Sequence, residues 1–426
     1  MGRIEPAGSL FVAMPKILHF ADAHIDMANY GRHDAQTGLP VRVMDFLKSL
    51  DTIVDAAIEE QVDLVLLAGD AYKDRNPAPT FQREWGERIM RIANAGIETI
   101  LLVGNHDLSP GLGRAHALET FNTLEVPRVH VVDKPTMLTP DDLGGVEVQV
   151  MAIPWISRSG MMAHFEMEGV EPSEVYDKLG ENIGDLIAGW IDIADTDLAI
   201  ILTAHATVQG ASYGGERTVM LGADMILTPS LVKNKSFDYV ALGHIHKAQD
   251  LNEGGQPPVV YPGSIERVDF GEAKDKKYFV LADVVRGKKV VPDWRELKDI
   301  RKYIDIPAIK LTSEKNVMDK IRKAMPTEDE LEGAIVRLTL EYPREWETLI
   351  DDAALREMTA LAFEFHLVKR PQMETRIRIP EGTVVGSLTP QELLDIYWKS
   401  THVDAEERKE LLRLAAEVIR EIKDTD

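Results

Sequence analysis

Five short apolar runs, separated by longer amphipathic segments, occupy the first two-thirds of the sequence and restrict its possible folds. They span residues 16–24, 62–70, 98–107, 198–206 and 237–246. Runs of this length that are nearly continuous in Val, Ile and Leu are typical of strands buried on both faces. Segments 44–60 and 80–96 have the spacing of amphipathic helices, and Gly96 stands where a helix is expected to end. Strands that alternate with helices predict a layered α/β fold.

Each of the five runs ends in side chains that can bind a metal ion. In chain order these are Asp22, His24, Asp70, Asn105, His106, His205, His244 and His246. Ligands bind beyond the carboxyl ends of the strands in open α/β sheets, so we expect the five loops to converge at one sheet edge. Other roles are open to the oxygen-bearing residues. Asp22 could form a turn, Asp70 and Asp107 could cap helices, and Asn105 could take a turn conformation. These roles leave the histidines unexplained.

Composition limits the kinds of site that the chain can carry. The 426 residues are enough for two or three domains, and there are no cysteines. A metal site must therefore use histidine, carboxylate, amide or water ligands, and a cytoplasmic location is expected. The formal net charge of −23 argues against nucleic-acid binding. That inference is weak, because binding uses a local face and bound cations are not counted.

No segment of the sequence has the apolar character that membrane insertion requires. Residues 1–13 lack the apolar core of a secretory signal, and we expect them to be a disordered extension or an alternative start before Met14. No apolar run approaches the ~20 residues needed to cross a bilayer. We therefore predict no membrane association.

Taken together, the polar blocks resemble a known family. The blocks are D-x-H (22–24), G-D (69–70), G-N-H-D (104–107), a single histidine (205) and G-H-x-H (243–246). Found in this order, they resemble the calcineurin-like metallophosphoesterases. Segments 68–80, 237–249 and 259–272 narrow the resemblance to SbcD-type nuclease subunits, bacterial relatives of the double-strand-break-repair nuclease. The similarity extends over about residues 14–285.

The resemblance implies a fold, an activity and a cofactor. The fold would be a four-layer sandwich of β-sheets flanked by helices, with a small α+β capping domain and a C-terminal helical tail. The activity would be 3′–5′ exonuclease cleavage of double-stranded DNA and endonuclease cleavage of single strands. The cofactor would be two divalent metal ions, for which the family suggests Mn²⁺. Within the same fold, the alternative is a phosphatase or cyclic-nucleotide phosphodiesterase. A different class would be a non-catalytic metal-binding scaffold that recruits an ATPase.

The resemblance also assigns roles to individual residues. One ion would be held by Asp22, His24, Asp70 and His246, and the other by Asp70, Asn105, His205 and His244. Asp70 would bridge the ions, so that His244 and His246 would serve different ones. His106 would act as the acid beside the site, and Asp107 could orient its ring.

Three further residues are candidates for substrate contact. Lys73 stands where some relatives carry a histidine and others an acidic residue, so it could contact the DNA backbone or be an ordinary solvated lysine. The balance of exonuclease to endonuclease activity is therefore open. Tyr261 and Ser264, in segment 259–272, are also predicted to contact substrate.

The chemistry of phosphodiester cleavage explains this set of ligands. A phosphodiester and an attacking hydroxide are both anions, and two divalent ions about 3.5–4 Å apart offset their repulsion. Because Asp22 and Asp70 are the only carboxylates in the predicted set, the loaded site stays cationic within an acidic protein. The mixture of imidazole and oxygen ligands suits Mn, Fe or Zn better than Ca.

After the nuclease domain, assigned to residues 14–285, the pattern changes. Residues 286–378 read as strand, helix, strand, helix and strand, and resemble the capping domain that guides DNA in this family. Its basic residues could equally form an ordinary solvated surface. Residues 379–388 read as a linker, and residues 389–426 as two helices with capping boxes at 389–392 and 404–407.

Partners follow from the resemblance. We expect DNA as substrate and an SbcC-like coiled-coil ATPase bound by the C-terminal helices. The apolar stripe of the second helix could instead pack back on its own domain. A homodimer is expected through helices near residues 80–96 and 113–123.

Overall fold

The structure is a computed structural model that describes residues 14–108, 115–156, 175–214, 225–372, 389–400 and 403–423. The expected N-terminal extension, the linker at 379–388 and the first two residues of segment 113–123 lie outside these ranges. The chain divides into two compact units, Met1–Ile304 and Asp305–Asp426, each described by itself.

The first unit contains two six-stranded sheets. The first has the order β14-β13-β1-β2-β3-β4 and the second β11-β12-β10-β7-β6-β5. In the first sheet the strands are β1 (Lys16–Phe20), β2 (Leu64–Leu67), β3 (Glu98–Leu102), β4 (Val129–Val132), β13 (Tyr278–Asp283) and β14 (Asp293–Glu296). In the second they are β5 (Thr136–Leu138), β6 (Val148–Ile153), β7 (Ala199–His205), β10 (Tyr239–Gly243), β11 (Gln249–Asp250) and β12 (Val259–Tyr261). Strands β1 to β4 run parallel to one another, as do β6, β7 and β10, whereas β13 pairs antiparallel with β1 and β5 with β6.

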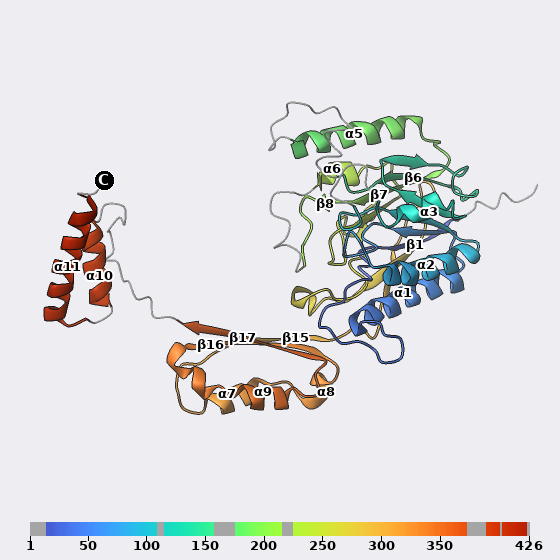
Figure 1. The fold of residues 1–426 in the computed structure, drawn as a ribbon. Helices are drawn as coiled ribbons and strands as arrows, with labels where there is room; N and C mark the ends of the chain where they lie inside the picture. Colours follow the sequence, from blue (N-terminus) through green and yellow to red (C-terminus); the bar gives the residue numbers. More distant parts are fainter. Residues whose placement is uncertain are drawn as a thin grey trace, which may run out of the picture. The chain divides into compact units, whose positions relative to one another are not determined.

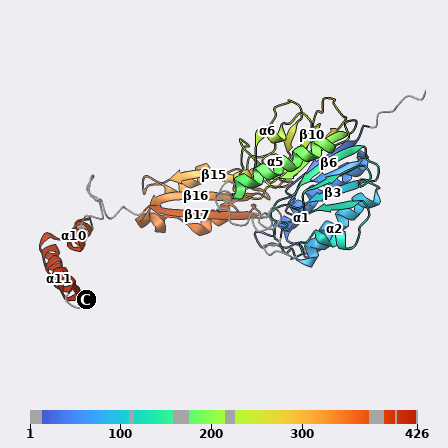
Figure 2. The same cartoon turned by 90° about the horizontal axis from the view of Figure 1, so that it is seen from above.

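Helices cover the outer face of each sheet (Figures 1 and 2). Helices α1 (Val41–Glu59) and α2 (Pro79–Asn94) pack on the first sheet, and α5 (Val175–Ile193) packs on the second. Short elements complete the unit: α3 (Glu119–Thr123), α6 (Pro229–Val232), η2 (Phe270–Glu272) and the two-stranded ladder of β8 (Thr207–Val208) and β9 (Ile226–Leu227).

Alternation along the strands builds three apolar layers. In β2, Val65 and Leu67 face the helices, whereas Leu64 and Leu66 face the other sheet. Strand β7 divides its residues in the same way between α5 and the layer between the sheets. Both faces of these strands are buried, which explains their continuous apolar sequence. The predicted four-layer sandwich is confirmed.

The five predicted strands are all present, but one expectation about them was wrong. They do not share one sheet edge, because β1, β2 and β3 belong to the first sheet and β7 and β10 to the second. The loops that carry the predicted ligands therefore follow strands of two different sheets. Periodicity shows that a strand is buried on both faces, and it does not show which strands are its neighbours.

The first unit extends beyond the predicted boundary at residue 285. Strand β14 pairs with β13, so residues 293–296 form the edge of the first sheet. Farther on, the Arg301 guanidinium donates hydrogen bonds of 2.5 and 2.7 Å to the Asp45 carboxylate on α1. These contacts place the end of the compact unit at Ile304.

The second unit begins with a three-stranded sheet of order β15-β16-β17. The strands are β15 (Tyr303–Lys310), β16 (Ile335–Pro343) and β17 (Glu364–Gln372), and the helical elements are α7 (Val317–Ala324), α8 (Glu328–Leu331), η3 (Arg344–Leu349) and α9 (Asp352–Met358). The helices lie on one face of the sheet (Figure 1), where Ile321, Leu331 and Leu355 are buried. The predicted order of strands and helices is present.

Two helices, α10 (Pro390–Ser400) and α11 (Ala405–Lys423), pack against each other near the C-terminus. The Thr389 amide donates a 2.7 Å hydrogen bond to Glu392 Oε2, and the Glu392 amide donates to Thr389 Oγ1 at 3.3 Å, which confirms the first capping box. At Asp404 the carboxylate accepts from the Glu406 amide instead. Among the described residues, no helix has the length and apolarity that spanning a bilayer requires.

Candidate metal centre

The site lies where the carboxyl ends of β1, β2, β3, β7 and β10 meet. Backbone hydrogen bonds tie the first two loops together: the Asp22 amide donates to the Gly69 carbonyl at 3.0 Å, and the Ala23 amide donates to the Asp70 carbonyl at 2.8 Å. The Asp22 carboxylate accepts from the His244 amide at 3.0 and 3.1 Å and so connects loops of different sheets. The structure brings all seven predicted ligands together.

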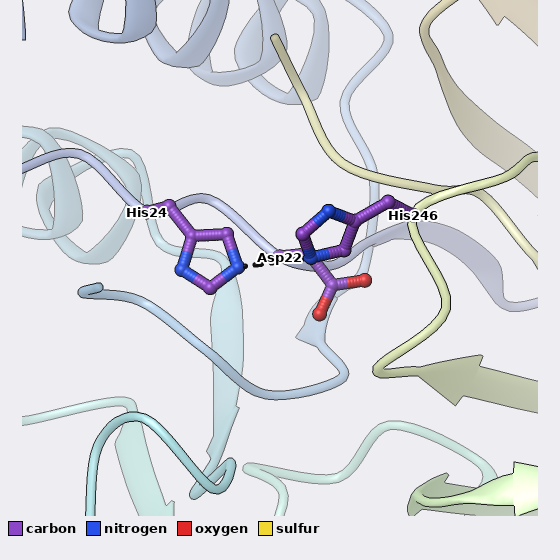
Figure 3. Close-up of side chains that lie close together, drawn as sticks. All are labelled: Asp22, His24 and His246. Atoms are coloured by element: carbon purple, nitrogen blue, oxygen red, sulfur yellow. Dashed lines mark hydrogen bonds between the residues drawn. The ribbon is translucent and has the colours of Figure 1, made fainter. Parts of the chain in front are cut away.

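A first group of ligand atoms comes from Asp22, His24 and His246 (Figure 3), and these atoms lie within 4.8 Å of one another. The Nε2 atoms of His24 and His246 are 3.1 Å apart. His24 follows β1 and His246 follows β10, so this group joins the two sheets.

A second group contains Asp22, Asp70 and His205, again with ligand atoms within 4.8 Å of one another. Asn105 adjoins this group, because its Oδ1 lies 3.0 Å from His205 Nε2 and 2.9 Å from His244 Nδ1. His244 therefore lies beside the second group and His246 belongs to the first.

Asp70 lies near both groups, as expected of a bridging ligand. Its Oδ2 is 3.3 Å from His205 Nε2 and 3.9 Å from His24 Nε2. Asp22 is a member of both groups, whereas the predicted assignment gave it to one ion alone.

Four histidines are held in one ring orientation by oxygen atoms behind them. The Nδ1 partners are the Tyr72 carbonyl for His24 (3.2 Å), the Ala68 carbonyl for His205 (2.7 Å), the Lys73 carbonyl for His106 (2.8 Å) and Glu272 Oε1 for His246 (2.8 Å). Carbonyl oxygens only accept, so Nδ1 carries a proton in the first three rings, and Nε2 is the nitrogen that points away from the carbonyl. A carboxylate imposes the same tautomer on the fourth ring.

This orientation makes the centre fit divalent cations. Two Nε2 lone pairs approach each other at 3.1 Å in the first group, and His205 Nε2 faces the oxygens of Asn105 and Asp70 in the second. Such contacts repel unless a proton or metal ion lies between them. Imidazole nitrogens with carboxylate and amide oxygens are suitable ligands for first-row divalent metals.

Burial and neighbouring charge shift the pKa values of these groups. Burial alone would raise the pKa of Asp70, but His205 and His106 hold it well below the usual range. Burial would lower the pKa of His205, but Asp70 raises it to about 9. The pKa of buried His24 lies well below its ordinary value because desolvation opposes its charge. The second group therefore favours a positive charge beside Asp70, which a bound cation would supply.

The backbone at four of the seven predicted ligands is left-handed. The φ angles are 51° at Asp22, 41° at His24, 58° at Asp70 and 95° at His244. Residues with a Cβ atom seldom adopt positive φ, and clusters of such residues occur at functional sites. These angles turn the chain sharply at the strand ends, so that D-x-H can direct both of its side chains to the centre.

Two motif glycines leave room for ligands. A Cβ on Gly69, which has a φ of 100°, would lie 2.0 Å from Nδ1 of His205. One on Gly104 would lie 2.1 Å from Oδ1 of Asp70. The glycines of the G-D and G-N-H-D blocks are thus required by close packing against ligands from other strands.

Asp107 has a different role from the one predicted. Its carboxylate accepts hydrogen bonds from the amides of Gly104 (2.9 Å), Asp70 (3.0 Å), Tyr72 (3.1 Å) and Ala71 (3.3 Å). It organises the backbone of the G-D loop, while the His106 ring is held by the Lys73 carbonyl. Burial and the charge of Asp70 raise the pKa of Asp107 to about 6.

His106 is partly exposed and lies at the mouth of the centre. Its ring centroid is 5.1 Å from that of His24. With Lys73, Asp74, Arg75 and Asn76 it lines an open pocket of about 540 Å³. His106 thus joins the ligand groups, through its contact with His24, to a pocket that carries two basic side chains, Lys73 and Arg75.

Tyr261 and Ser264 do not line this opening. Both are 0% exposed. The Tyr261 hydroxyl donates to the Ala206 carbonyl at 2.6 Å and accepts from the Val208 amide at 3.0 Å. Ser264 Oγ accepts a 2.7 Å hydrogen bond from Lys277 Nζ. Their burial gives these residues a structural role in place of the substrate contact that we expected.

The sequence reasoning missed two residues that touch the ligands. Trp155 comes shortly after β6 in the chain. Its ring packs on the His244 ring, with centroids 5.0 Å apart and planes inclined by 33°. Glu272 contacts His246 from behind. Burial would raise the pKa of Glu272, but Lys277 and His246 hold it well below the usual range. For Glu272 the signal was its place at the end of segment 259–272, one of the segments that carry the family resemblance. Trp155 carried a weaker signal, namely its position just beyond an apolar run.

Comparisons with known proteins agree with this geometry. Residues 15–248 match the family model described as calcineurin-like phosphoesterase. The SbcD component of the nuclease SbcCD from Escherichia coli (strain K12) is 27% identical over 286 residues, which cover 64% of this chain and 66% of that protein. The protein of the same name from Rhodobacter capsulatus is 28% identical over 347 residues, covering 77% of this chain and 81% of that protein.

An archaeal protein is similar over the same region. DNA double-strand break repair protein Mre11 of Archaeoglobus fulgidus is 26% identical over 301 residues, covering 67% of this chain and 61% of that protein. This chain thus spans just under two thirds of the length of the Escherichia coli and Archaeoglobus relatives.

Proposed function

This chain belongs to the calcineurin-like phosphoesterase family, and from that premise we propose that it is a two-metal DNA nuclease of the SbcD type. The observation that carries the proposal is the convergence of seven ligand side chains from five strand ends into two adjoining groups. The three relatives described above, all named as nucleases or break-repair proteins, support DNA as the substrate class.

We assign the two groups to two divalent ions, for which Mn²⁺ is our choice. Asp22, His24, Asp70 and His246 would hold one ion, and Asp70, Asn105, His205 and His244 the other. When bound, the ions would supply positive charge to a phosphodiester and activate water as the nucleophile. The buried carboxylates of Asp22 and Asp70 and the fixed imidazoles keep the ligand atoms in place for this purpose.

His106 would work on the substrate side of the centre. Its Nδ1 donates to the Lys73 carbonyl, so Nε2 is the atom that faces substrate. When that atom is protonated, it would donate a hydrogen bond to a phosphate oxygen and deliver the proton to the leaving 3′ oxygen. Lys73 and Arg75 in the adjoining pocket would contact neighbouring phosphates.

The remaining parts of the proposal concern partners. The sheet of β15, β16 and β17 with its helices, which we call the capping unit, would guide DNA. Helices α10 and α11 would bind a coiled-coil ATPase of the SbcC type. Their apolar side chains Leu393, Tyr397 and Leu414 are 37%, 41% and 44% exposed, which suits a protein partner. Homodimerisation through helices near residues 80–96 and 113–123 and the cytoplasmic location remain predictions.

The first test is cleavage of linear DNA, single- and double-stranded, with Mn²⁺ or Mg²⁺. We expect degradation with Mn²⁺. His106→Ala should lower the rate by about 10²–10⁴-fold, because it removes the acid without removing a metal ligand. Mn²⁺ affinity, measured by isothermal titration calorimetry, should be unchanged.

His33→Ala is the matched control, because this exposed histidine lies outside the centre. It should cleave DNA at the rate of the unaltered protein. If the protein with Mn²⁺ hydrolysed small phosphomonoesters and left DNA intact, the phosphatase alternative would replace the nuclease. If it bound Mn²⁺ and cleaved neither, the scaffold alternative would hold.

The second test concerns the tail. A chain ending near residue 385 should lose binding to the ATPase in a pull-down, because α10 and α11 are absent. Leu361→Asp in the capping unit is the control, since Leu361 is 52% exposed and lies outside the tail. Undiminished binding by the shortened chain would exclude the tail as the binding site.

A further inference from the structure

A buried acidic side chain behind the metal centre has no part in the function proposed so far. Glu272, at the end of η2, is 1% exposed. Its Oε1 lies 2.8 Å from His246 Nδ1. It is thus the only one of the four Nδ1 partners that carries a charge, the other three being backbone carbonyls.

The other oxygen of Glu272 is held by donors. Oε2 accepts from Lys277 Nζ at 2.5 Å, from the Val268 amide at 3.2 Å and lies 3.1 Å from Ser264 Oγ. Lys277 is 1% exposed and Ser264 is 0% exposed, so these contacts are shielded from water. The carboxylate cannot rotate without breaking a buried ion pair, and Oε1 remains aimed at His246.

The same segment also holds the backbone of His246. The His246 carbonyl accepts from the Ser264 amide at 3.2 Å and from Lys277 Nζ at 3.4 Å. Both the ring and the main chain of this ligand are therefore fixed by residues of segment 264–277.

We propose that Glu272 is a positioning residue: it keeps the His246 ring protonated at Nδ1, so that Nε2 presents its lone pair to a divalent ion, and Lys277 fixes Glu272 in turn. This inference rests on the proposed two-metal function. A histidine ligand commonly gives its second N–H to an oxygen behind it, and losing that partner typically weakens metal binding by about 10–100-fold.

Glu272→Gln tests the proposal with nearly unchanged shape. Lys277 Nζ and the Val268 amide only donate, so the amide oxygen should take the place of Oε2. The amide NH₂ would then face His246 Nδ1 and donate to it. The ring proton should move to Nε2, which removes the lone pair from the metal site.

Two measurements follow for the full chain. Nitrogen-15 NMR of the histidine rings, without metal, should show the Nδ1–H tautomer of His246 in the unaltered protein and the Nε2–H tautomer in Glu272→Gln. Calorimetric titration with Mn²⁺ should show one of the two sites weakened by about 10–100-fold.

Glu98→Gln is the matched control. Glu98 is also a buried carboxylate, with His130 Nε2 and Arg128 Nη1 each at 2.8 Å, but it starts β3 at the end away from the centre. Its replacement should leave the His246 tautomer and both Mn²⁺ affinities unchanged. Equal weakening by Glu98→Gln and Glu272→Gln would reduce Glu272 to a general structural role and overturn the proposal.

An unchanged tautomer and unchanged Mn²⁺ affinity in Glu272→Gln would also overturn it. If the unpaired Lys277 prevents folding, Glu272→Gln/Lys277→Met removes the buried charge, and the Val268 amide still orients the new side chain. That double variant should show the same tautomer and the same loss of affinity. Failure of the unaltered protein to cleave DNA would refute the nuclease, whereas the tautomer and binding data would still decide the role of Glu272.

Discussion

His106 and Asp107 are adjacent in the chain, yet only the His106 side chain is accessible to solvent. Asp107 is 1% exposed and holds four backbone amides of the metal loops. The sequence indicates that both residues matter, because they share one block. It does not separate a side chain that touches substrate from one that shapes the loop, since that depends on which way each residue points.

His19 provides a pH-dependent prediction at the residue scale. It lies in β1 between the two sheets, is 0% exposed and places Nδ1 3.1 Å from the Tyr239 hydroxyl. Burial lowers its pKa from 6.5 to about 3. The folded protein therefore keeps His19 neutral, whereas the unfolded chain binds a proton below pH 6.5.

The stability that His19 contributes is thus complete above pH 6.5 and is lost as the pH falls toward 3. At pH 5 the loss should be about 2 kcal/mol relative to pH 7.5. His19→Gln cannot titrate and should reduce the fall in the free energy of unfolding between these pH values by that amount. Urea unfolding at both pH values measures it, and equal losses in the two proteins would contradict the assignment.

The sequence was enough to predict which side chains meet at the centre. It was not enough to predict the residues that hold those side chains in place. The convergence of the seven residues was predictable because five apolar runs each end in a polar block. Glu272 escaped because its role depends on a contact with His246, 26 positions earlier, and on burial beside Lys277. Neither feature leaves a periodic trace in the sequence.

At the scale of elements, the existence of strands and helices followed from apolar spacing, while their grouping did not. Strand β13 returns from the far end of the first unit to pair antiparallel with β1, and β14 continues that sheet. A polar edge strand such as β14, with sequence DWRE, gives little apolar signal. The predicted end of the nuclease domain at residue 285 therefore lies before the end of the compact unit at Ile304.

Two shortened chains test this boundary. A chain ending at residue 285 lacks β14, the buried face of Trp294 and the Arg301–Asp45 ion pair, all of which a chain ending at residue 304 retains. The shorter chain should be less stable by about 3 kcal/mol or more, mainly through loss of the tryptophan. Urea unfolding compares them directly, and equal free energies of unfolding would restore the earlier boundary.

The whole molecule consists of two compact units, and all predicted metal ligands belong to the first. Metal binding should therefore stabilise one unit and leave the other unaffected. At a Mn²⁺ concentration 100 times the dissociation constant, a single site adds about 2.7 kcal/mol to the stability of the folded state.

Scanning calorimetry of the full chain checks this expectation. In excess EDTA the transition of the first unit should move to lower temperature, because the stabilisation by bound ions is removed. The transition of the second unit should stay in place and serve as the internal control. A parallel shift of both transitions, or of neither, would contradict a metal centre confined to the first unit.

The left-handed backbone at Asp22, His24, Asp70 and His244 has a consequence for engineering this protein. A residue with a Cβ atom in that conformation costs roughly 1–2 kcal/mol relative to glycine. A search for heat-resistant variants, carried out without metal, should accumulate glycine or asparagine at His24 and His244. At Asp22 and Asp70 it should accumulate asparagine, whose side-chain oxygen still accepts from the His244 and His106 amides. Such variants would gain thermal tolerance and lose the ability to hold an ion, so a screen of this protein must select for both properties at once.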